Sequence, residues 1–305
     1  MEKDLYRYLA IALFALTLTQ CGQEPEAPKT MADVKEIIPP PPEGILIDDQ
    51  DWEPVVEGMF YADGPSVDKD GNLYYSTIPT SLINRIDSDG NETNFEPFSM
   101  QTLGMYFGHD ERLYACRNGD ASIVAYDQDG SFEVVHSGKA SPVEGFPGAD
   151  SEFCNDLVVL SNGDIYFTDR ALKLITLIPK DGEPRIVWEG LRPNGIALYE
   201  NDRRLAVGDS NNPRVLSLSI AENGDLTEME NFYDPIFYVE VPSRGVTQPG
   251  INGMTTDTEG RLYVTTFFGL QIFSNEGKHL GLIRTPNPYA SNVIFGGPEL
   301  GTLYV

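Results

Sequence analysis

The stretch Gly71-Asn72-Leu73-Tyr74-Tyr75-Ser76 carries the main fold signal, because versions of it return five more times along the chain. Each copy joins a polar turn to a short apolar and aromatic strand. The other copies begin at Glu111, Gly163, Arg203, Gly260 and Gly301. Residues equivalent to Tyr74 follow one another after 40, 52, 40, 57 and 41 residues. About 40 residues provide four short strands and their turns, which is one blade of a β-propeller.

The sequence around each copy supplies the rest of a blade. A strand that runs into an acidic or glycine turn follows five of the copies, in Ile83–Gly90, Ile123–Gly130, Leu174–Gly182, Val215–Gly224 and Leu270–Gly277. No long stretch has apolar residues at helical spacing. The sequence therefore predicts an all-β fold, a six-bladed β-propeller with four strands per blade.

The sixth copy ends at Val305, directly after its second strand. The last blade is therefore expected to be truncated. The segment Asp51–Gly58 precedes the first blade, and it could supply an outer strand by ring closure. The long spacings between copies leave room for loops.

The N-terminus is predicted to direct export. Residues 1–21 read as a lipoprotein signal peptide, in which the apolar run Leu9–Thr19 is too short to span a bilayer as a stable helix. It ends at Leu18-Thr19-Gln20-Cys21, which resembles a bacterial lipobox whose cysteine becomes the lipidated first residue. The alternative is an ordinary signal peptide with a chance cysteine. The protein is expected to be membrane-anchored through Cys21, on the periplasmic side or at the cell surface.

Two further segments complete the predicted domain organisation. Residues 22–44 are proline-rich and are expected to form an extended tether. Residues 45–305 are expected to form the propeller. The formal net charge of −26 repels phosphate backbones, so nucleic acid is excluded as a partner. Cys116 and Cys154 can form a pair, but two buried free thiols are expected, because the geometry of a disulfide is demanding.

The starts of the predicted first strands share a polar position. Five of the six carry an Asp or Asn in phase, namely Asp63, Asn155, Asn194, Asn252 and Asn292. First strands line the channel of a propeller, so these side chains are expected to converge on its axis. Oxygen ligands of this kind suit calcium, and there is no Cys/His cluster for zinc. The alternative is that they are turn residues that tolerate left-handed backbone angles.

The same stretches carry a family resemblance. They are Asp63-Gly64-Pro65, Asn155-Asp156-Leu157, Pro193-Asn194-Gly195-Ile196, Ile251-Asn252-Gly253-Met254, and Phe295-Gly296-Gly297 with Thr302-Leu303-Tyr304-Val305. From Asp51 to Val305 the chain resembles the gluconolactonase, regucalcin and senescence-marker-protein family, which is related to diisopropylfluorophosphatase. The resemblance implies a six-bladed propeller with a divalent cation in the channel, usually calcium. It also implies hydrolysis of lactones, or of phosphoester-like bonds in relatives.

The resemblance also implies site residues. Asp63, Asn155 and Asn194 fall on metal ligands of the family. Asn252 falls where the family has an aspartate that binds metal and is proposed as a base. The chain departs from the pattern there, because an amide cannot serve as a general base. Asp63 stands where the family usually has Glu, and Phe153 and Cys154 occupy a stretch where it commonly has an arginine.

A catalytic base must then come from elsewhere. Asp156 adjoins a predicted ligand, and Asp169 and Asp209 end predicted second strands. For each of them, the alternative role is structural hydrogen bonding or turn capping. No Gly-x-Ser-x-Gly motif is present, which disfavours a serine nucleophile. The prediction is a metal-dependent hydrolase acting on a lactone or related ester as its small-molecule substrate. The alternative is a non-catalytic propeller that binds a ligand or partner and has a weakened metal site.

Overall fold

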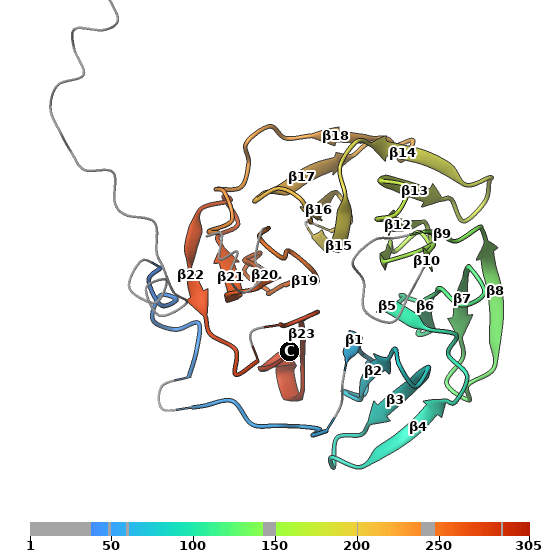
Figure 1. Ribbon diagram of the computed structural model, residues 1–305, viewed down its shortest axis with the longest axis horizontal. Coiled ribbons are helices and arrows are strands. Elements are labelled where there is room, and N and C mark those ends of the chain that lie inside the picture. Colours follow the sequence, from blue (N-terminus) through green and yellow to red (C-terminus); the bar gives the residue numbers. More distant parts are fainter. Residues whose placement is uncertain are drawn as a thin grey trace, which may run out of the picture.

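The computed structural model describes residues 38–47, 50–58, 61–142, 151–199, 201–238, 248–287 and 289–305. Cys21, the predicted signal peptide and the tether up to residue 37 lie outside the described residues. Small antiparallel sheets radiate from a central channel, as in a β-propeller (Figure 1). No helix among the described residues is long and apolar enough to cross a membrane.

Five sheets have four strands each, and in each the chain runs from the channel outward (Figure 1). The first blade holds β1 (Ala62–Val67), β2 (Leu73–Thr77), β3 (Leu82–Ile86) and β4 (Glu92–Glu96). The second holds β5 (Thr102–Phe107), β6 (Leu113–Arg117), β7 (Ser122–Tyr126) and β8 (Phe132–Ser137). The third holds β11 (Asp156–Val159), β12 (Ile165–Asp169), β13 (Leu174–Ile178) and β14 (Arg185–Glu189). The fourth holds β15 (Pro193–Tyr199), β16 (Arg204–Asp209), β17 (Val215–Ile220) and β18 (Leu226–Glu228). The fifth holds β19 (Met254–Thr256), β20 (Leu262–Thr266), β21 (Gly269–Phe273) and β22 (His279–Ile283).

The structure has five complete blades rather than the six that were predicted. The sixth position of the ring holds a two-stranded sheet of β23 (Ile294–Gly296) and β24 (Thr302–Tyr304), with the short 3-10 helix η2 (Pro298–Leu300) between them. Strand β23 contacts both β19 and β1, so it lies between the fifth and first blades. A second two-stranded sheet, of β9 (Ser141–Pro142) and β10 (Ser151–Glu152), occupies part of the long insertion between the second and third blades.

The recurring motif forms the second strand of each blade, as its apolar composition predicts. Strands β2, β6, β12, β16 and β20 are buried along their whole length, whereas the outer strands β4 and β8 are largely exposed. The hydrophobic core therefore lies between neighbouring blades. One cluster, for example, joins Tyr166 and Leu177 of the third blade to Leu205 and Leu218 of the fourth.

The segment before β1 packs on the outside of the ring. The Pro39 carbonyl accepts a hydrogen bond from Leu282 N at 3.0 Å on the edge strand β22, and Ile38 is buried beside it. Trp52 packs against the fifth blade and the sixth sheet, and its indole N–H donates to Arg284 O at 2.6 Å. Asp51–Gly58 forms no strand, so its predicted role as an outer strand is wrong. It attaches through side chains, and Pro54 in its middle lacks the N–H that a ladder needs.

Candidate functional site

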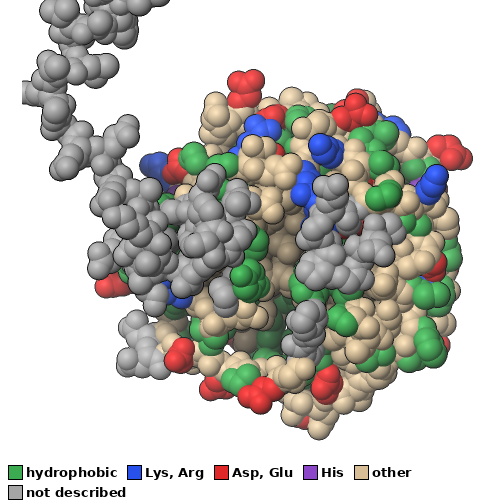
Figure 2. Space-filling model, in the orientation of Figure 1, with side chains coloured by type: hydrophobic (Ala, Val, Ile, Leu, Met, Phe, Trp, Pro, Cys, Tyr) green, Lys and Arg blue, Asp and Glu red, His purple; other side chains and the backbone are tan. Residues whose placement is uncertain are grey.

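Six strands surround the channel, namely β1, β5, β11, β15, β19 and β23, and each contacts its two neighbours (Figure 1). Figure 2 shows this face of the molecule hollowed near its centre. Three of the ladders between first and second strands shift register at the start of the first strand: between Asp63 and Ser66, between Thr102 and Met105, and between Pro193 and Ile196. Two of these shifts fall at predicted ring residues, Asp63 and Asn194. Such bulges bend a strand and redirect its side chains.

Asp63 lies at the start of β1 and is buried. Its Oδ1 accepts hydrogen bonds from Gly64 N at 2.8 Å and from Asn292 Nδ2 at 3.2 Å. Burial raises the pKa of Asp63, and the donors around it only partly offset this effect. The negative charge of a carboxylate in this position is therefore incompletely compensated, and a cation beside it would stabilise it.

Three predicted amide ligands lie on neighbouring inner elements. Asn194 is on β15, Asn155 directly precedes β11, and Asn252 lies two residues before β19. The Oδ1 atom of Asn194 is buried and has no hydrogen-bond partner among the described residues. A buried amide oxygen without a partner costs about 1–3 kcal/mol, so it needs a ligand, a water or an ion.

Two glycines allow the inner strands to approach one another closely. A Cβ atom on Gly195 would lie 2.1 Å from the Asn252 carbonyl oxygen, and one on Gly104 would lie 2.3 Å from Asp156 Oδ1. Any side chain at these positions would push the inner strands apart. The glycine that follows Asn194 is therefore needed for packing around the channel.

Asp156 is a second buried acid at the start of an inner strand. Burial, and then the nearby charge of Asp63, raises the pKa of Asp156 to about 8. Its Oδ1 accepts from Leu157 N at 2.9 Å, and its Oδ2 accepts from Ile196 N at 3.3 Å across the blade boundary. Asp156 is thus a carboxyl group that can exchange a proton near neutral pH, and such groups are enriched at catalytic sites.

The other two predicted catalytic acids lie at the ends of second strands, as expected. Asp209 accepts from Asn211 N at 3.0 Å and from the Asn212 side chain at 2.7 Å. Asp169 accepts from Leu172 N at 2.7 Å, and burial raises its pKa to about 6. Both carboxylates accept hydrogen bonds from the loop that follows them and so stabilise that loop. Their catalytic role stays a prediction.

In three of the blades, a hydroxyl group on the second strand links the first strand to the next blade. The sequence analysis did not identify these links. Thr168 Oγ1 donates to Asn194 O at 2.6 Å and accepts from Asp156 N at 3.1 Å. Ser76 Oγ contacts Asp63 O and Leu103 O at 3.1 and 3.4 Å, and Thr265 Oγ1 contacts Gly253 O and Ser291 O at 2.9 and 3.3 Å. All three hydroxyls occupy the last position of the recurring six-residue motif, and this shared position is the signal that could have revealed them.

In the second blade, that motif position holds Cys116, which forms a disulfide with Cys154. The expectation of two free thiols is therefore wrong. The Cα atoms lie 5.2 Å apart, within the range that a disulfide requires, because neighbouring blades approach closely here. Asn118 supports the same segment, donating to Cys154 O at 2.9 Å and accepting from Phe153 N at 2.7 Å. The bridge thus anchors the residue that precedes Asn155.

Sequence reasoning also missed a buried ion pair. Arg170 Nη2 lies 2.6 Å from Glu152 Oε2, with side-chain exposures of 9% and 1%. The positive charge of Arg170 partly offsets the raised pKa of both Asp63 and Tyr61, so it acts on the channel. Burying two charges costs about as much free energy as their attraction returns, so a buried ion pair contributes little to stability. A functional role for this pair is therefore favoured. The sequence did not indicate that Glu152 and Arg170 pair, because the two residues are 18 positions apart in the chain.

Tyr61 is another polar group beside Asp63. Its hydroxyl lies 3.5 Å from Asp63 Oδ2 and also hydrogen-bonds the side chain of Asn252. Burial raises the pKa of Tyr61 strongly, so the phenol stays protonated. Tyr61 therefore connects the predicted ligands of the first and fifth blades.

The donor set suits a hard cation. Within the described ranges, no three His, Cys, Asp or Glu side chains form a metal-binding group. The four predicted ligands comprise one carboxylate, Asp63, and three amide side chains, Asn155, Asn194 and Asn252. Calcium accepts mixed carboxylate, amide and water oxygens, whereas zinc prefers Cys and His. The unpartnered Asn194 Oδ1 fits a ring of this kind, and the metal role of the four residues stays a prediction.

The chain is similar to known proteins over most of its length. Residues 61–305 match the family model described as the SMP-30/Gluconolactonase/LRE-like region. A gluconolactonase of Zymomonas mobilis is 26% identical over 281 residues, which are 80% of this chain and 75% of the relative. Among solved structures, a gluconolactonase from Xanthomonas campestris gives a TM-score of 0.63 at 21% identity, covering 79% of this chain and 81% of that one. A calcium-binding regucalcin from Agrobacterium tumefaciens gives 0.57 at 16% identity, covering 80% and 81%.

Proposed function

Because the chain belongs to the SMP-30/Gluconolactonase/LRE-like family, we propose that it hydrolyses a lactone or related ester in its central channel, assisted by a divalent cation. Calcium is the proposed ion, and its proposed ligands are Asp63, Asn155, Asn194 and Asn252. The observation that carries this proposal is the buried Asn194 Oδ1, which has no hydrogen-bond partner among the described residues. A buried amide oxygen in this state favours a bound cation or water.

When bound, such a cation polarises the lactone carbonyl as a Lewis acid and lowers the pKa of the carboxyl groups next to it. The protein residues then perform the proton transfers. Deprotonated Asp156 accepts the proton that the attacking water loses, and it returns a proton to the ring oxygen that leaves as a hydroxyl group. The backbone donors Leu157 N and Ile196 N hold its carboxylate in place.

The ion pair of Glu152 and Arg170 is proposed to bind the substrate. Glu152 Oε1 is buried and has no hydrogen-bond partner among the described residues, so it can accept a hydrogen bond from a substrate hydroxyl group. Lactones of sugar acids carry several hydroxyl groups that can both donate and accept. This pair is therefore proposed to select polyhydroxylated lactones over plain aliphatic ones.

A second function is favoured by Asn252. Its side chain is an amide and hydrogen-bonds Tyr61, so it cannot take a proton as the family's aspartate is proposed to do. If Asp156 does not replace that base, the propeller binds a lactone-like ligand without turning it over.

Location is a further part of the proposal. We infer that the protein is exported and held at a membrane through lipidated Cys21. The Cys116–Cys154 disulfide supports this view, because such bridges persist in oxidising compartments and are rare in the cytosol.

The test combines calcium titration with a panel of lactones, using the purified full chain. Asp63→Asn removes the only negative charge among the four proposed ligands, so calcium affinity should fall at least tenfold. Asp89→Asn is the matched control, because Asp89 is exposed on a turn of the same blade and its removal should change nothing. Asn252→Asp should tighten calcium binding and raise turnover.

The outcomes separate the alternatives. Calcium binding with lactone turnover supports the hydrolase, and calcium binding without turnover in the parent and in Asn252→Asp supports a binding propeller. If Asp63→Asn binds calcium as well as the parent does, the ring consists of turn residues and the metal proposal fails.

A further inference from the structure

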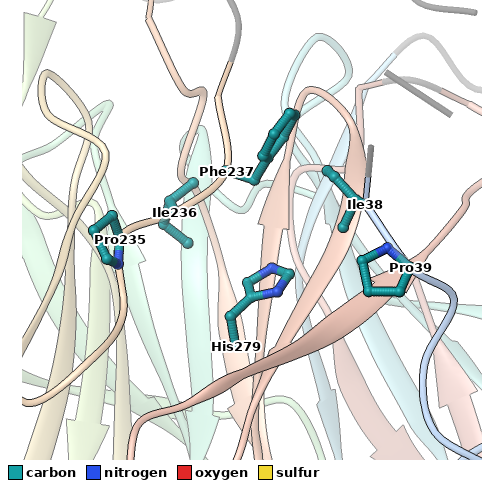
Figure 3. A pocket seen from close by; sticks show the side chains of 6 residues that line it. All are labelled: Ile38, Pro39, Pro235, Ile236, Phe237 and His279. Carbon is teal, nitrogen blue, oxygen red and sulfur yellow. The ribbon is translucent and has the colours of Figure 1, made fainter. Parts of the chain in front are cut away.

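An open cavity of about 310 Å³ lies beside β22, the outermost strand of the fifth blade (Figure 3). It is bounded by the outermost strand of the fifth blade, by the segment after β18 and by the segment that precedes the first blade. Its lining residues are Ile38, Pro39, Pro235, Ile236, Phe237 and His279. This volume is at the small end of the range for ligand pockets.

The lining has one polar side chain. Figure 3 shows the His279 imidazole rising from β22 between the two apolar walls, with Ile236 on one side and Pro39 on the other. The residues that line the cavity are held by the protein core. Ile38 packs on Phe268 and Leu282, and Ile236 belongs to the cluster that contains Phe273. The cavity is therefore bounded by packed side chains.

The hydrogen bonds around Gln271 define which nitrogen of His279 carries its proton. Gln271 is fully buried on β21, where its Oε1 accepts from Phe237 N at 2.7 Å and its Nε2 donates to Phe237 O at 2.8 Å. This pair of bonds orients the amide, so its oxygen faces His279 Nε2 at 3.0 Å. An amide oxygen only accepts, and His279 must therefore carry its proton on Nε2.

The Nδ1 atom of neutral His279 is then an acceptor. The hydrogen bond to Gln271 uses Nε2 and leaves Nδ1 as the ring nitrogen that can accept from a ligand. Burial lowers the pKa of His279, although the charge of Asp234 opposes this, so the imidazole is neutral at neutral pH. The cavity thus offers apolar walls and a single lone pair.

We propose that this cavity binds a small apolar molecule with one hydrogen-bond donor, of the phenol class, whose hydroxyl donates to His279 Nδ1. The apolar side chains flank the ring of the ligand, and Phe237 offers it an aromatic neighbour. A carboxylate is excluded as a partner, because a second acceptor would face the Nδ1 lone pair. The proposal does not depend on lactone hydrolysis in the channel.

Phenol and toluene are matched probes, since they differ in the donor. With the full chain, calorimetry should give saturable phenol binding with a dissociation constant of about 1 mM, as expected for so small a ligand. Phenol should bind about fivefold more tightly than toluene, which is the usual net effect of one hydrogen bond. His279→Phe should abolish this preference.

His136→Phe is the control, because His136 lies on the outer strand β8 of another blade and is also surrounded by aromatic rings. It should keep the preference for phenol. A second measurement needs no variant: the ¹⁵N shift of His279 Nδ1 should move when phenol is added, and the chain has only three histidines to assign. Equal affinity for both probes, no saturable binding, or an unchanged Nδ1 shift would overturn the proposal.

Discussion

Thr168 offers a sharp test of how the blades hold the ring in place. Its hydroxyl is buried in β12, donates to Asn194 O at 2.6 Å and accepts from Asp156 N at 3.1 Å. Thr168→Val keeps the shape of the side chain and removes the hydroxyl. A buried carbonyl and a buried amide then lose their common partner at the boundary between the third and fourth blades.

Leaving one buried polar group unpaired costs about 1–3 kcal/mol, so the loss of both contacts should cost about 2–4 kcal/mol after local relaxation. Urea unfolding measures this change. With a slope of about 3 kcal/mol/M, the midpoint should fall by about 1 M while the slope stays constant. Calcium affinity should fall as well, because the substitution disturbs the backbone of Asn194 and Asp156.

Two variants control for other causes. Thr168→Ser keeps the hydroxyl and should restore most of the stability, as the serine at the equivalent position in the first blade indicates. Thr77→Val removes a hydroxyl that bonds the Thr80 side chain at 2.6 Å, so it should cost less than about 1 kcal/mol. If Thr168→Val unfolds at the same urea concentration as the parent, or if Thr77→Val lowers the urea midpoint by as much as Thr168→Val does, the two hydrogen bonds of Thr168 do not hold the blades together.

Three further predictions concern stability and location. Replacing Cys116 and Cys154 by serine should lower the free energy of unfolding by about 2–4 kcal/mol, and a reductant should then have no further effect on the melting temperature. The raised pKa of Asp169 means that the native state holds a proton that the unfolded state releases, so between pH 4 and pH 6 this group makes the protein less stable as the pH rises. Asp169→Asn should remove up to about 3 kcal/mol of that loss in urea titrations at pH 4 and pH 7, and parallel pH curves for both proteins would contradict the assigned cause. Cys21→Ser should move the protein from the membrane to the soluble fraction, and unchanged sedimentation with membranes would remove the lipobox interpretation.

The repeat was sufficient to predict the propeller, because each blade is encoded locally. A turn residue followed by Leu-Tyr and a small residue specifies a strand through interactions among near neighbours, and the six copies fell on β2, β6, β12, β16, β20 and β24. The number of complete blades was the exception. Asp51–Gly58 was expected to pair as a strand, but Pro54 and its side-chain packing prevent this.

For the candidate site, the sequence indicated which residues lie at the starts of the inner strands. It could not indicate what surrounds them. The raised pKa of Asp156 depends on burial and on Asp63, which is 93 positions away in the chain. The ion pair of Glu152 and Arg170 and the hydroxyl links between blades likewise depend on which strands become neighbours.

The sequence alone thus determined the strand pattern, the blade repeat and the polar positions at the starts of the inner strands, since these follow from alternation, turns and spacing along the chain. The tertiary structure alone determined the Cys116–Cys154 bond, the orphaned Asn194 oxygen and the proton position on His279. Each of these depends on distances of a few ångströms between residues from different strands or blades. Such distances arise from packing, and no local pattern in the chain encodes them.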